Sequence, residues 1–335
     1  MPSPLISILT PFKNTSPYLA DCLDSILNQT YQHWELIIVD DHSTDNSYEI
    51  VNTYSKKEPR IKLFKTNGEG IIEALRLAFS KSNGELITRM DSDDIMLPNR
   101  LEILANSLTN HGLGHVAIGQ VQYFSHEGIS DGYARYEKWL NTLTRSGSNY
   151  SEIYKECVIP SPCWMVYRDD LMACEAFQPN NYPEDYDLTF RFYRAGLTCI
   201  PCKSILHLWR DYSTRTSRTH EHYAQNYFLN IKLRYFLELD HKKERPLVIW
   251  GAGYKGKTIA QQLITQGVPF YWLCDNPKKI GKQIYDQPLL SFDHLKDLDL
   301  PQSIVTVANE TEQLKIRTYF DSLNMLPMND YFFFC

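Results

Sequence analysis

Three aspartates occur within the four consecutive residues Asp91-Ser92-Asp93-Asp94, directly after an apolar run that predicts a buried strand at 86–90. Carboxylates two residues apart in a turn at a strand end can face one divalent cation, and oxygen ligands suit Mg²⁺ or Mn²⁺. Such an ion bridges protein carboxylates to the phosphates of a substrate. Taken alone, however, the four residues are more typical of a solvated turn whose aspartates cap a helix.

A second pattern lies near the C-terminal end of the sequence. Gly251, Gly253 and Gly256 have the GxGxxG spacing after a predicted strand, and Asp275 closes the next predicted strand. This dinucleotide fingerprint places phosphates at a helix N-terminus and the acidic residue near a ribose hydroxyl, so these four residues are candidate ligand contacts. Only residues 246–335 remain for such a fold, so a structural role is favoured over binding of a nucleotide or partner, and nicotinamide chemistry is the least favoured alternative.

The composition is that of an ordinary globular protein, and its 335 residues favour two domains. The 34 Lys and Arg residues against 40 Asp and Glu residues give a formal net charge of -6, which argues against a nucleic acid partner. Apolar runs are far shorter than the roughly 20 residues of a spanning helix, and the N-terminus lacks the features of a signal peptide. We therefore expect a cytoplasmic protein with reduced cysteines.

Strand-like and helix-like segments alternate in the first part of the sequence, which predicts βα units and an α/β fold with a mostly parallel sheet. The predicted strands are 5–10, 34–39, 61–65 and 86–90, and the predicted helices are 17–27, 47–54, 71–79 and 101–108. Asp40 and Asp41 follow the second strand, and the acidic turn follows the fourth. Ligands bind at the carboxyl ends of parallel strands, so we expect the chemistry at this edge.

The pattern is less regular from residue 116 onward. We expect a strand at 116–124, a loop that could face an acceptor over most of 125–149, a strand at 163–167 and a helix at 184–195. A long amphipathic helix with apolar residues from Tyr223 to Tyr235 leads into a charged run that ends at Pro246. A new β-α pattern then begins, with segments at 247–250, 258–266, 270–274 and 304–308. The predicted domains are a catalytic domain at 1–220, a helical linker at 221–245 and a small Rossmann-like α/β domain at 246–335.

Over roughly the first 220 residues, the order of motifs resembles that of family 2 glycosyltransferases of the GT-A fold. The stretches that carry this resemblance are 6–14, 25–30, 35–45, 89–94 and 183–188, the last of which contains Glu184-Asp185. The resemblance implies an inverting, metal-dependent transfer of a sugar from a nucleoside-diphosphate sugar, usually a UDP-sugar, to an acceptor hydroxyl. It also implies a Mn²⁺ or Mg²⁺ cofactor and an acceptor in cell-surface glycan or glycoconjugate synthesis, such as a lipid-linked glycan. Peripheral association with the inner face of a membrane is compatible with such an acceptor.

The resemblance also assigns roles to residues. Donor nucleotide contacts are implied for Thr10, Pro11, Asn14, Asp40 and Asp91. Asp93 is the implied metal ligand, with Asp91 secondary and His207 a weak further candidate, since a lone histidine is more often structural. Asp185 is the implied general base, which requires hydrogen-bond reach of the acceptor hydroxyl. Candidates for the diphosphate or the acceptor are Glu184, Arg210, Arg215 and Arg218, although a solvated basic segment explains the arginines equally well.

The sequence departs from the family pattern at two places. Arg76 stands where relatives often carry Asn, and the usual paired glycines before Glu184-Asp185 are absent around 177–179. Both departures flank the expected donor and acceptor pockets, so they leave the reaction class intact and the identity of the sugar open.

The C-terminal region resembles small Rossmann-like domains that are appended to some family 2 glycosyltransferases, with further matching points at 275–281 and 330–331. Two alternatives to a glycosyltransferase remain. One is an NAD-dependent oxidoreductase acting through the GxGxxG domain, and the other is a sugar-nucleotide-binding protein without turnover. Intact Asp93 and Asp185 argue against the second.

Overall fold

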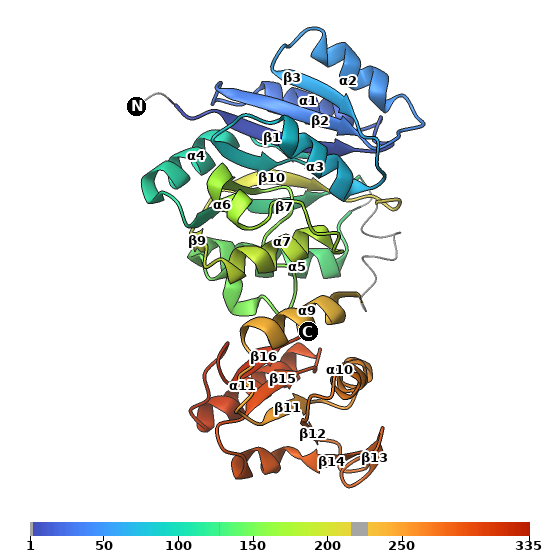
Figure 1. Ribbon diagram of the computed structural model, residues 1–335, viewed down its shortest axis with the longest axis vertical. Helices are drawn as coiled ribbons and strands as arrows, with labels where there is room; N and C mark the ends of the chain where they lie inside the picture. The colour runs from blue at the N-terminus through green and yellow to red at the C-terminus, as the bar shows by residue number, and fades with distance from the viewer. Residues whose placement is uncertain (1–2, 127, 216–226) are drawn as a thin grey trace. The chain divides into compact units, whose positions relative to one another are not determined.

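The computed structural model describes residues 3–126, 128–215 and 227–335, which form two compact units (Figure 1). Of these residues, unit 1 comprises 3–126, 128–150 and 158–215, and unit 2 comprises 151–157 and 227–335. The units differ from the predicted domains at 151–157, which pack with the C-terminal residues. The reason is that the ring of Tyr154 stacks on Phe334 at 5.3 Å and Glu152 pairs with Arg317 at 2.7 Å.

Unit 1 is built around a seven-stranded sheet in the order β3-β2-β1-β4-β8-β6-β9. Its first four strands are parallel: β1 (Ile6–Phe12), β2 (Trp34–Asp40), β3 (Ile61–Lys65) and β4 (Leu86–Arg89). The helices between them are α1 (Leu19–Leu27), α2 (Ser47–Ser55) and α3 (Ile71–Lys81). The predicted alternation and the mostly parallel sheet are confirmed.

The burial of these elements explains their sequence patterns. Every residue of β1 and β2 is buried, because both strands lie inside the sheet with helices on its faces, so their sequences are nearly continuous apolar runs. Strand β3 lies at the edge and is mostly half-buried. Helix α1 buries Leu19, Cys22 and Ile26 at helical spacing, which fixes the face that it turns to the sheet.

The remaining elements of unit 1 complete the sheet and add a smaller one. Their bounds are β5 (Ile95–Met96), α4 (Arg100–His111), β6 (His115–Ile118), β7 (Gln120–Phe124), α5 (Asp131–Ser146), β8 (Trp164–Tyr167), α6 (Arg168–Ala173), α7 (Glu184–Arg194), β9 (Thr198–Ile200) and β10 (Ile205–Arg210). Strand β8 is antiparallel to β4 and β6, and the second sheet has the order β5-β10-β7. The strands that carry the acidic turn and the 205–210 segment are thereby brought together.

Two predictions for 116–149 are wrong. The expected strand at 116–124 is two strands in different sheets, separated at Gly119, where a Cβ atom would lie 2.7 Å from Cys163 Sγ. The expected loop at 125–149 contains the 16-residue helix α5. Ser130 caps this helix by accepting from Tyr133 N, and Gly147 ends it in the left-handed conformation. The helical period is present in the sequence, since Tyr133, Tyr136, Leu140 and Leu143 recur at helical spacing.

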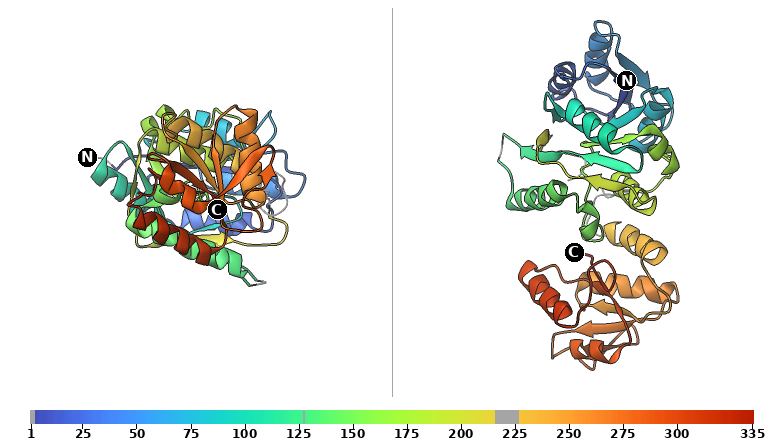
Figure 2. Two further views of the ribbon diagram at one scale, coloured as in Figure 1. Left: turned by 90° about the horizontal axis from the view of Figure 1, so that it is seen from below. Right: turned by 90° about the vertical axis from the view of Figure 1, so that its left-hand side faces the viewer.

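Unit 2 contains a six-stranded sheet in the order β13-β14-β12-β11-β15-β16. Its elements are α9 (Tyr227–Leu239), β11 (Leu247–Trp250), α10 (Tyr254–Thr265), β12 (Tyr271–Cys274), β13 (Gln283–Ile284), β14 (Gln287–Ser291), β15 (Gln302–Val305), α11 (Glu310–Ser322) and β16 (Tyr331–Phe333). Helices α10 and α11 lie on opposite faces of the sheet (Figures 1 and 2). This is the doubly wound arrangement, in which the strand order reverses between β11 and β15. No helix in the described parts of the chain is both long and apolar enough to cross a bilayer.

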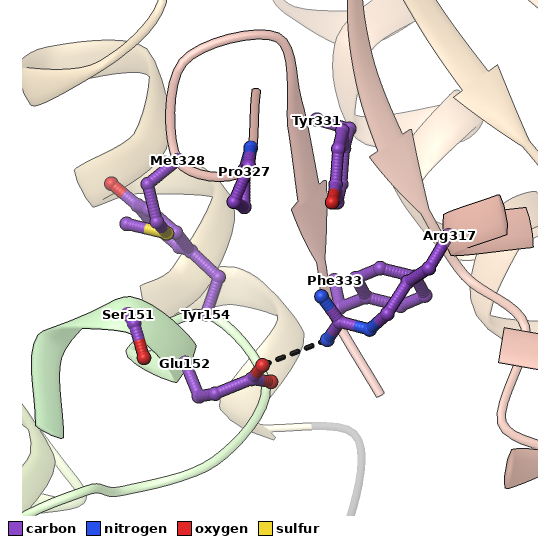
Figure 3. Close-up of a pocket in the computed structure, with 8 residues that line it drawn as sticks. All are labelled: Ser151, Glu152, Tyr154, Arg317, Pro327, Met328, Tyr331 and Phe333. Carbon is purple, nitrogen blue, oxygen red and sulfur yellow. Dashed lines mark hydrogen bonds and ion pairs between the residues drawn. The ribbon is translucent and has the colours of Figure 1, made fainter. Parts of the chain in front are cut away.

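A small hollow in unit 2 lies beside β16 and α11 (Figure 3). Its lining residues are Ser151, Glu152, Tyr154, Arg317, Pro327, Met328, Tyr331 and Phe333. The guanidinium of Arg317 fills much of it, because it pairs with Glu152 and lies 4.1 Å from the centre of the Phe333 ring. The remaining volume of about 10 Å³ has room for about one water molecule, so the hollow is too small for an organic ligand.

The turn between β11 and α10 gives a stability prediction. A Cβ atom at Gly256 would lie 2.0 Å from Gly251 O, so Gly256→Ala must displace α10 from β11 and should destabilise unit 2 by about 1–3 kcal/mol. Gly253→Ala is the matched control, since a Cβ atom there meets nothing within 4 Å. Urea-dependent hydrogen exchange of the β11 and β15 amides measures the free energy of unfolding of unit 2 in both variants. Equal stability of the two variants would contradict this packing.

Candidate active site

The carboxyl ends of β1, β2 and β4 lie side by side. Phe12 is the partner of Asp40 in the β1·β2 ladder, and Leu9 is the partner of Arg89 in the β1·β4 ladder. The hydrogen bond from Met90 N to Leu9 O continues the second pairing, so the acidic turn begins beside Thr10. The sheet thus brings the residues predicted for the donor nucleotide to one edge.

Two oxygen atoms at this edge are buried without a hydrogen bond among the described residues. They are Thr10 Oγ1 and Asp40 Oδ2. Asp40 Oδ1 accepts from Ser43 N at 2.9 Å, and Lys65 Nζ lies 3.8 Å from Oδ2. Buried polar atoms without partners are costly and call for an explanation, and a bound molecule that donates N–H or O–H groups is one.

The other predicted nucleotide contacts, Pro11 and Asn14, lie in the loop after β1. Pro11 is buried, whereas Asn14 is exposed and has a φ of 52°. Asn14 Oδ1 accepts from Thr44 N at 2.7 Å and from Asp45 N at 3.4 Å. The side-chain oxygen of Asn14 therefore ties the loop after β1 to the loop after β2, which leaves only its amide group for a ligand.

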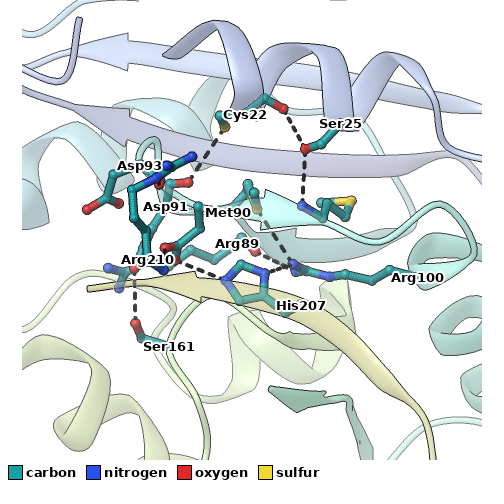
Figure 4. Close-up of polar contacts among 12 residues, drawn as sticks. Cys22, Ser25, Arg89, Met90, Asp91, Asp93, Arg100, Ser161, His207 and Arg210 are labelled. Atoms are coloured by element: carbon teal, nitrogen blue, oxygen red, sulfur yellow. Dashed lines mark hydrogen bonds and ion pairs between the residues drawn. The ribbon is translucent and has the colours of Figure 1, made fainter. Parts of the chain in front are cut away.

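The three aspartates of the acidic turn have different partners, and Figure 4 shows Asp91 and Asp93 with their surroundings. Asp91 Oδ1 accepts from Arg89 Nε at 2.8 Å, and its Oδ2 lies 3.4 Å from Ser161 Oγ. Asp93 Oδ2 accepts from the hydroxyl of Tyr212 at 2.9 Å. Asp94 Oδ1 accepts from Arg210 N at 2.8 Å. Asp94 is wholly buried, whereas Asp93 is 9% exposed, so Asp94 supports the turn from within and a small part of Asp93 stays accessible.

Burial and neighbouring charges shift the pKa values of the three aspartates in different directions. Burial and the neighbouring charge of Asp94 raise the pKa of Asp93 to about 6. Burial raises the pKa of Asp94 to about 7 against the opposing charge of Arg215. Burial also disfavours the charge on Asp91, but Arg89 and Arg215 outweigh it and hold the pKa of Asp91 below its usual value. Asp91 is therefore the anion that the protein itself compensates, whereas the charge on Asp93 calls for a further cation.

His207 is fully buried, and both of its ring nitrogens face protein groups (Figure 4). Arg100 Nη1 donates to His207 Nδ1 at 2.9 Å, so the proton lies on Nε2, which is 2.9 Å from Asp94 Oδ2. Burial and the charge of Arg100 hold the pKa of His207 well below its usual value. The neutral imidazole thus orients Asp94. It has no free nitrogen for the metal contact that the sequence weakly predicted.

Glu184 and Asp185 lie in the first turn of α7. Glu184 Oε1 accepts from Arg89 Nη1 at 3.0 Å, while Asp185 is half-buried. Burial and the adjacent charge of Glu184 raise the pKa of Asp185 to about 7 against the opposing charge of Arg89. Such a value suits a group that exchanges protons near neutral pH.

The guanidinium of Arg89 joins the two acidic segments of the site. Its side chain is 6% exposed, and it pairs with Asp91 at the end of β4 and with Glu184 at the start of α7. The residue belongs to the motif at 89–94, but nothing in the sequence indicates that it reaches a residue 95 positions away. Arg100 and Tyr212 are two further supports of the acidic turn that the sequence did not single out.

The predicted arginines differ in what they contact. Arg210 Nε donates to Asp93 O at 2.7 Å, and Arg210 Nη2 donates to Asp21 Oδ2 at 2.8 Å. Arg215 lies over the ring of Trp209 at 5.1 Å, and the nearby charges of Asp94 and Asp93 raise its pKa although burial opposes this. Both side chains are nearly buried, so neither belongs to a solvated basic segment. Arg218 lies outside the described residues.

In unit 2, the Gly251–Gly253 turn and Asp275 lie at the same edge of the sheet, because β11 and β12 are parallel neighbours that end there. Asp275 is exposed, and Lys279 Nζ donates to Ala252 O at 3.0 Å. Helix α10 begins directly after Gly253, as the fingerprint requires, and Gly256 supplies the close approach described above. Ligand contacts by Gly251, Gly253, Gly256 and Asp275 remain a prediction.

Unit 1 therefore has a sheet with an acidic turn at the carboxyl edge of its parallel strands, an arrangement that defines an α/β nucleotide-binding class. Residues 7–174 match the model of the family "Glycosyl transferase family 2". The chain belongs to this family, as its motifs predicted.

Individual relatives agree with this assignment. The chain is 45% identical to glycosyltransferase GlyG of Streptococcus pneumoniae over 103 residues. This aligned stretch covers 30% of this chain and 34% of GlyG. The chain thus matches about a third of the length of that relative. Among solved structures, TarS of S. aureus in complex with UDP-GlcNAc has a TM-score of 0.53 at 17% identity, covering 77% of this chain and 71% of TarS. Mannosyltransferase PcManGT of Pyrobaculum calidifontis, in complex with GDP-Man and Mn²⁺, has a TM-score of 0.52 at 17% identity. The match covers 79% of this chain and 75% of PcManGT. These similarities confirm the GT-A type of fold.

The buried position of Arg89 gives a prediction. Arg89→Gln removes the cation that pairs with both Asp91 and Glu184, while Arg215 remains near Asp91, and should lower the free energy of unfolding of unit 1 by about 3–5 kcal/mol. Lys13→Gln is the control, since the Lys13 side chain is mostly exposed and its pair with Asp41 at 3.5 Å should contribute less than about 1 kcal/mol. Urea unfolding followed by hydrogen exchange of the β1 and β4 amides compares the two. A similar, small loss in both variants would argue against the bridge.

Proposed function

We propose that the chain is an inverting, metal-dependent glycosyltransferase that moves a sugar from a UDP-sugar to a hydroxyl of a cell-surface glycan or lipid-linked glycan. The observation that carries the proposal is the bridge of Arg89 between Asp91, in the acidic turn, and Glu184, beside Asp185. It joins a segment suited to a diphosphate to a carboxyl suited to proton transfer.

The donor side of the proposal rests on unsatisfied groups. Thr10 Oγ1 and Asp40 Oδ2 would accept from the nucleoside, which offers N–H and O–H donors. Asp91 and the loop at Pro11 and Asn14 would lie against the same nucleoside. The complexes of TarS with UDP-GlcNAc and of PcManGT with GDP-Man support a nucleotide-sugar donor, and UDP is our proposal for this chain.

A Mn²⁺ or Mg²⁺ ion fits the residues of the acidic turn. Burial and the neighbouring carboxylates raise the pKa of Asp93, and a divalent cation would stabilise its charged form. In the described parts of the chain, no group of three or more His, Cys, Asp or Glu side chains is arranged to hold a metal. Asp93 would therefore hold the ion together with donor phosphate oxygens, and the ion would neutralise charge on the leaving diphosphate. Arg215 lies near enough to the turn to add to that neutralisation.

Asp185 is the proposed general base. Its carboxylate would take the proton from the acceptor hydroxyl as that oxygen attacks the anomeric carbon, and the bond to the diphosphate breaks on the opposite side. One direct displacement of this kind inverts the anomeric configuration. The first turn of α7 has three acidic residues, of which Glu184 is held by Arg89 and Asp187 by Arg191, so Asp185 is the one left for this task.

The proposed roles predict that substitution of Asp185 impairs transfer, whereas substitution of Asp93 impairs donor binding. Asp185→Asn removes the proton acceptor and should lower transfer at least about 100-fold while Mn²⁺-dependent binding of UDP stays within about twofold. Asp93→Asn should abolish that binding. UDP binding is measured by calorimetry with Mn²⁺, and transfer by UDP release from a panel of UDP-sugars with simple glycoside acceptors.

Asp169→Asn is the control for Asp185→Asn, because Asp169 is an exposed aspartate in the first turn of another helix, α6. It should leave both binding and transfer unchanged. Transfer at the wild-type rate by Asp185→Asn would overturn the assignment of the base.

The raised pKa of Asp185 predicts the pH dependence of transfer. Below pH 7 the carboxyl is increasingly protonated and cannot accept a proton, so the rate should fall about tenfold per pH unit and level off above about pH 7. Initial rates between pH 5 and 9 at saturating donor test this. A rate that is unchanged or higher at pH 5 would show that a group with an ordinary carboxyl pKa, or none, acts as the base.

A further inference from the structure

The two departures from the family pattern contact each other. Arg76 lies in α3, and its guanidinium meets the segment that lacks the usual glycines before Glu184-Asp185. Its Nε donates to Phe177 O at 2.9 Å, and its Nη2 donates to Gln178 O at 2.5 Å and to Asn180 Oδ1 at 2.6 Å. Its Nη1 pairs with Glu73. The planar fork of an arginine can serve these acceptors at once, whereas a lysine ammonium cannot.

The backbone before this segment has a conformation that favours glycine. Glu175 and Ala176 have φ values of 62° and 43°, in the left-handed region that side chains with a Cβ atom rarely adopt. Such a conformation persists only when surrounding contacts hold it. Arg191 Nη1 donates to Ala176 O at 2.7 Å on one side, and Arg76 holds Phe177 and Gln178 on the other.

The segment 177–183 leads directly into α7, which begins with Glu184 and Asp185. The start of this segment is also fixed by Phe177, which is 5% exposed and packs edge-on against Phe79 of α3 at 6.2 Å. Its end is held by Asn181 Nδ2, which donates to Asp187 Oδ1 at 3.0 Å. A displacement of this segment would therefore move Asp185.

We propose that Arg76 is a positioning residue for the acceptor side of the site: it holds residues 177–180 in one conformation and thereby places Asp185. The arginine does this through hydrogen bonds to two backbone carbonyls and to Asn180 Oδ1. The inference rests on the proposed function of Asp185 as the base. A fixed segment favours one orientation of the acceptor hydroxyl, because catalysis depends on small changes in the position of the base.

The test compares Arg76→Gln and Arg76→Lys with Lys81→Gln, which removes a charge from an exposed position of the same helix. Hydrogen exchange of the 177–183 amides should accelerate at least about tenfold in both Arg76 variants and stay unchanged in Lys81→Gln. Binding of UDP with Mn²⁺ should stay within about twofold in all three. Transfer with the UDP-sugar and glycoside pair that the wild type turns over should fall about 10- to 100-fold in the Arg76 variants, in kcat or in the KM for the glycoside.

A rescue variant separates positioning from general damage. Glu175→Gly and Ala176→Gly, added to Arg76→Gln, relieve the unfavourable backbone conformation and should restore part of the transfer rate. Unchanged exchange at 177–183 in Arg76→Gln, or faster exchange with wild-type transfer, would overturn the inference. Failure of the proposed function is distinguishable, because it appears as transfer by Asp185→Asn whatever the exchange of residues 177–183.

Discussion

Arg89 lies at the end of β4 with its guanidinium between two carboxylates, Asp91 at 2.8 Å and Glu184 at 3.0 Å. All three side chains are mostly buried, so none of the charges is well solvated and each depends on the others. The position of the acidic turn and the position of α7 are therefore not independent. A sheet edge and a helix that are distant in sequence become one site through a single cation.

The remaining charges at this edge are arranged around that bridge. His207 and Arg210 bind Asp94 from β10, so the second sheet holds the acidic turn from the side opposite to β1. Arg89 compensates the charge of Asp91, whereas Asp94 is held by hydrogen bonds and keeps a raised pKa. Asp93 also has a raised pKa, and Thr10 and Asp40 each have a buried oxygen without a hydrogen bond among the described residues. We propose that a bound substrate satisfies these groups.

Much of this could be predicted from the sequence, because β1, β2 and β4 are buried and their apolar runs are bounded by polar turns. The order of strands and acidic turns identified the fold, the family and the edge at which Asp40, Asp91 and Asp93 gather. Helix α5 was within reach of the sequence as well, because Tyr133, Tyr136, Leu140 and Leu143 recur at helical spacing. The partners of Arg89 and Arg76 could not be predicted, since both arginines reach across about 100 residues of chain and only the folded backbone brings their acceptors near. Sequence alone also gave no reason to assign His207 to Asp94.

The central claim is that Arg89 makes the acidic turn and the start of α7 one electrostatic unit. A double-mutant cycle with Arg89→Gln, Glu184→Gln and the double variant measures this directly as the coupling in the free energy of unfolding of unit 1. The account predicts a coupling of at least about 1 kcal/mol, because removal of Glu184 relieves part of the repulsion that Arg89→Gln creates. Losses that add to within about 0.3 kcal/mol would show that the two side chains act independently and would contradict the account.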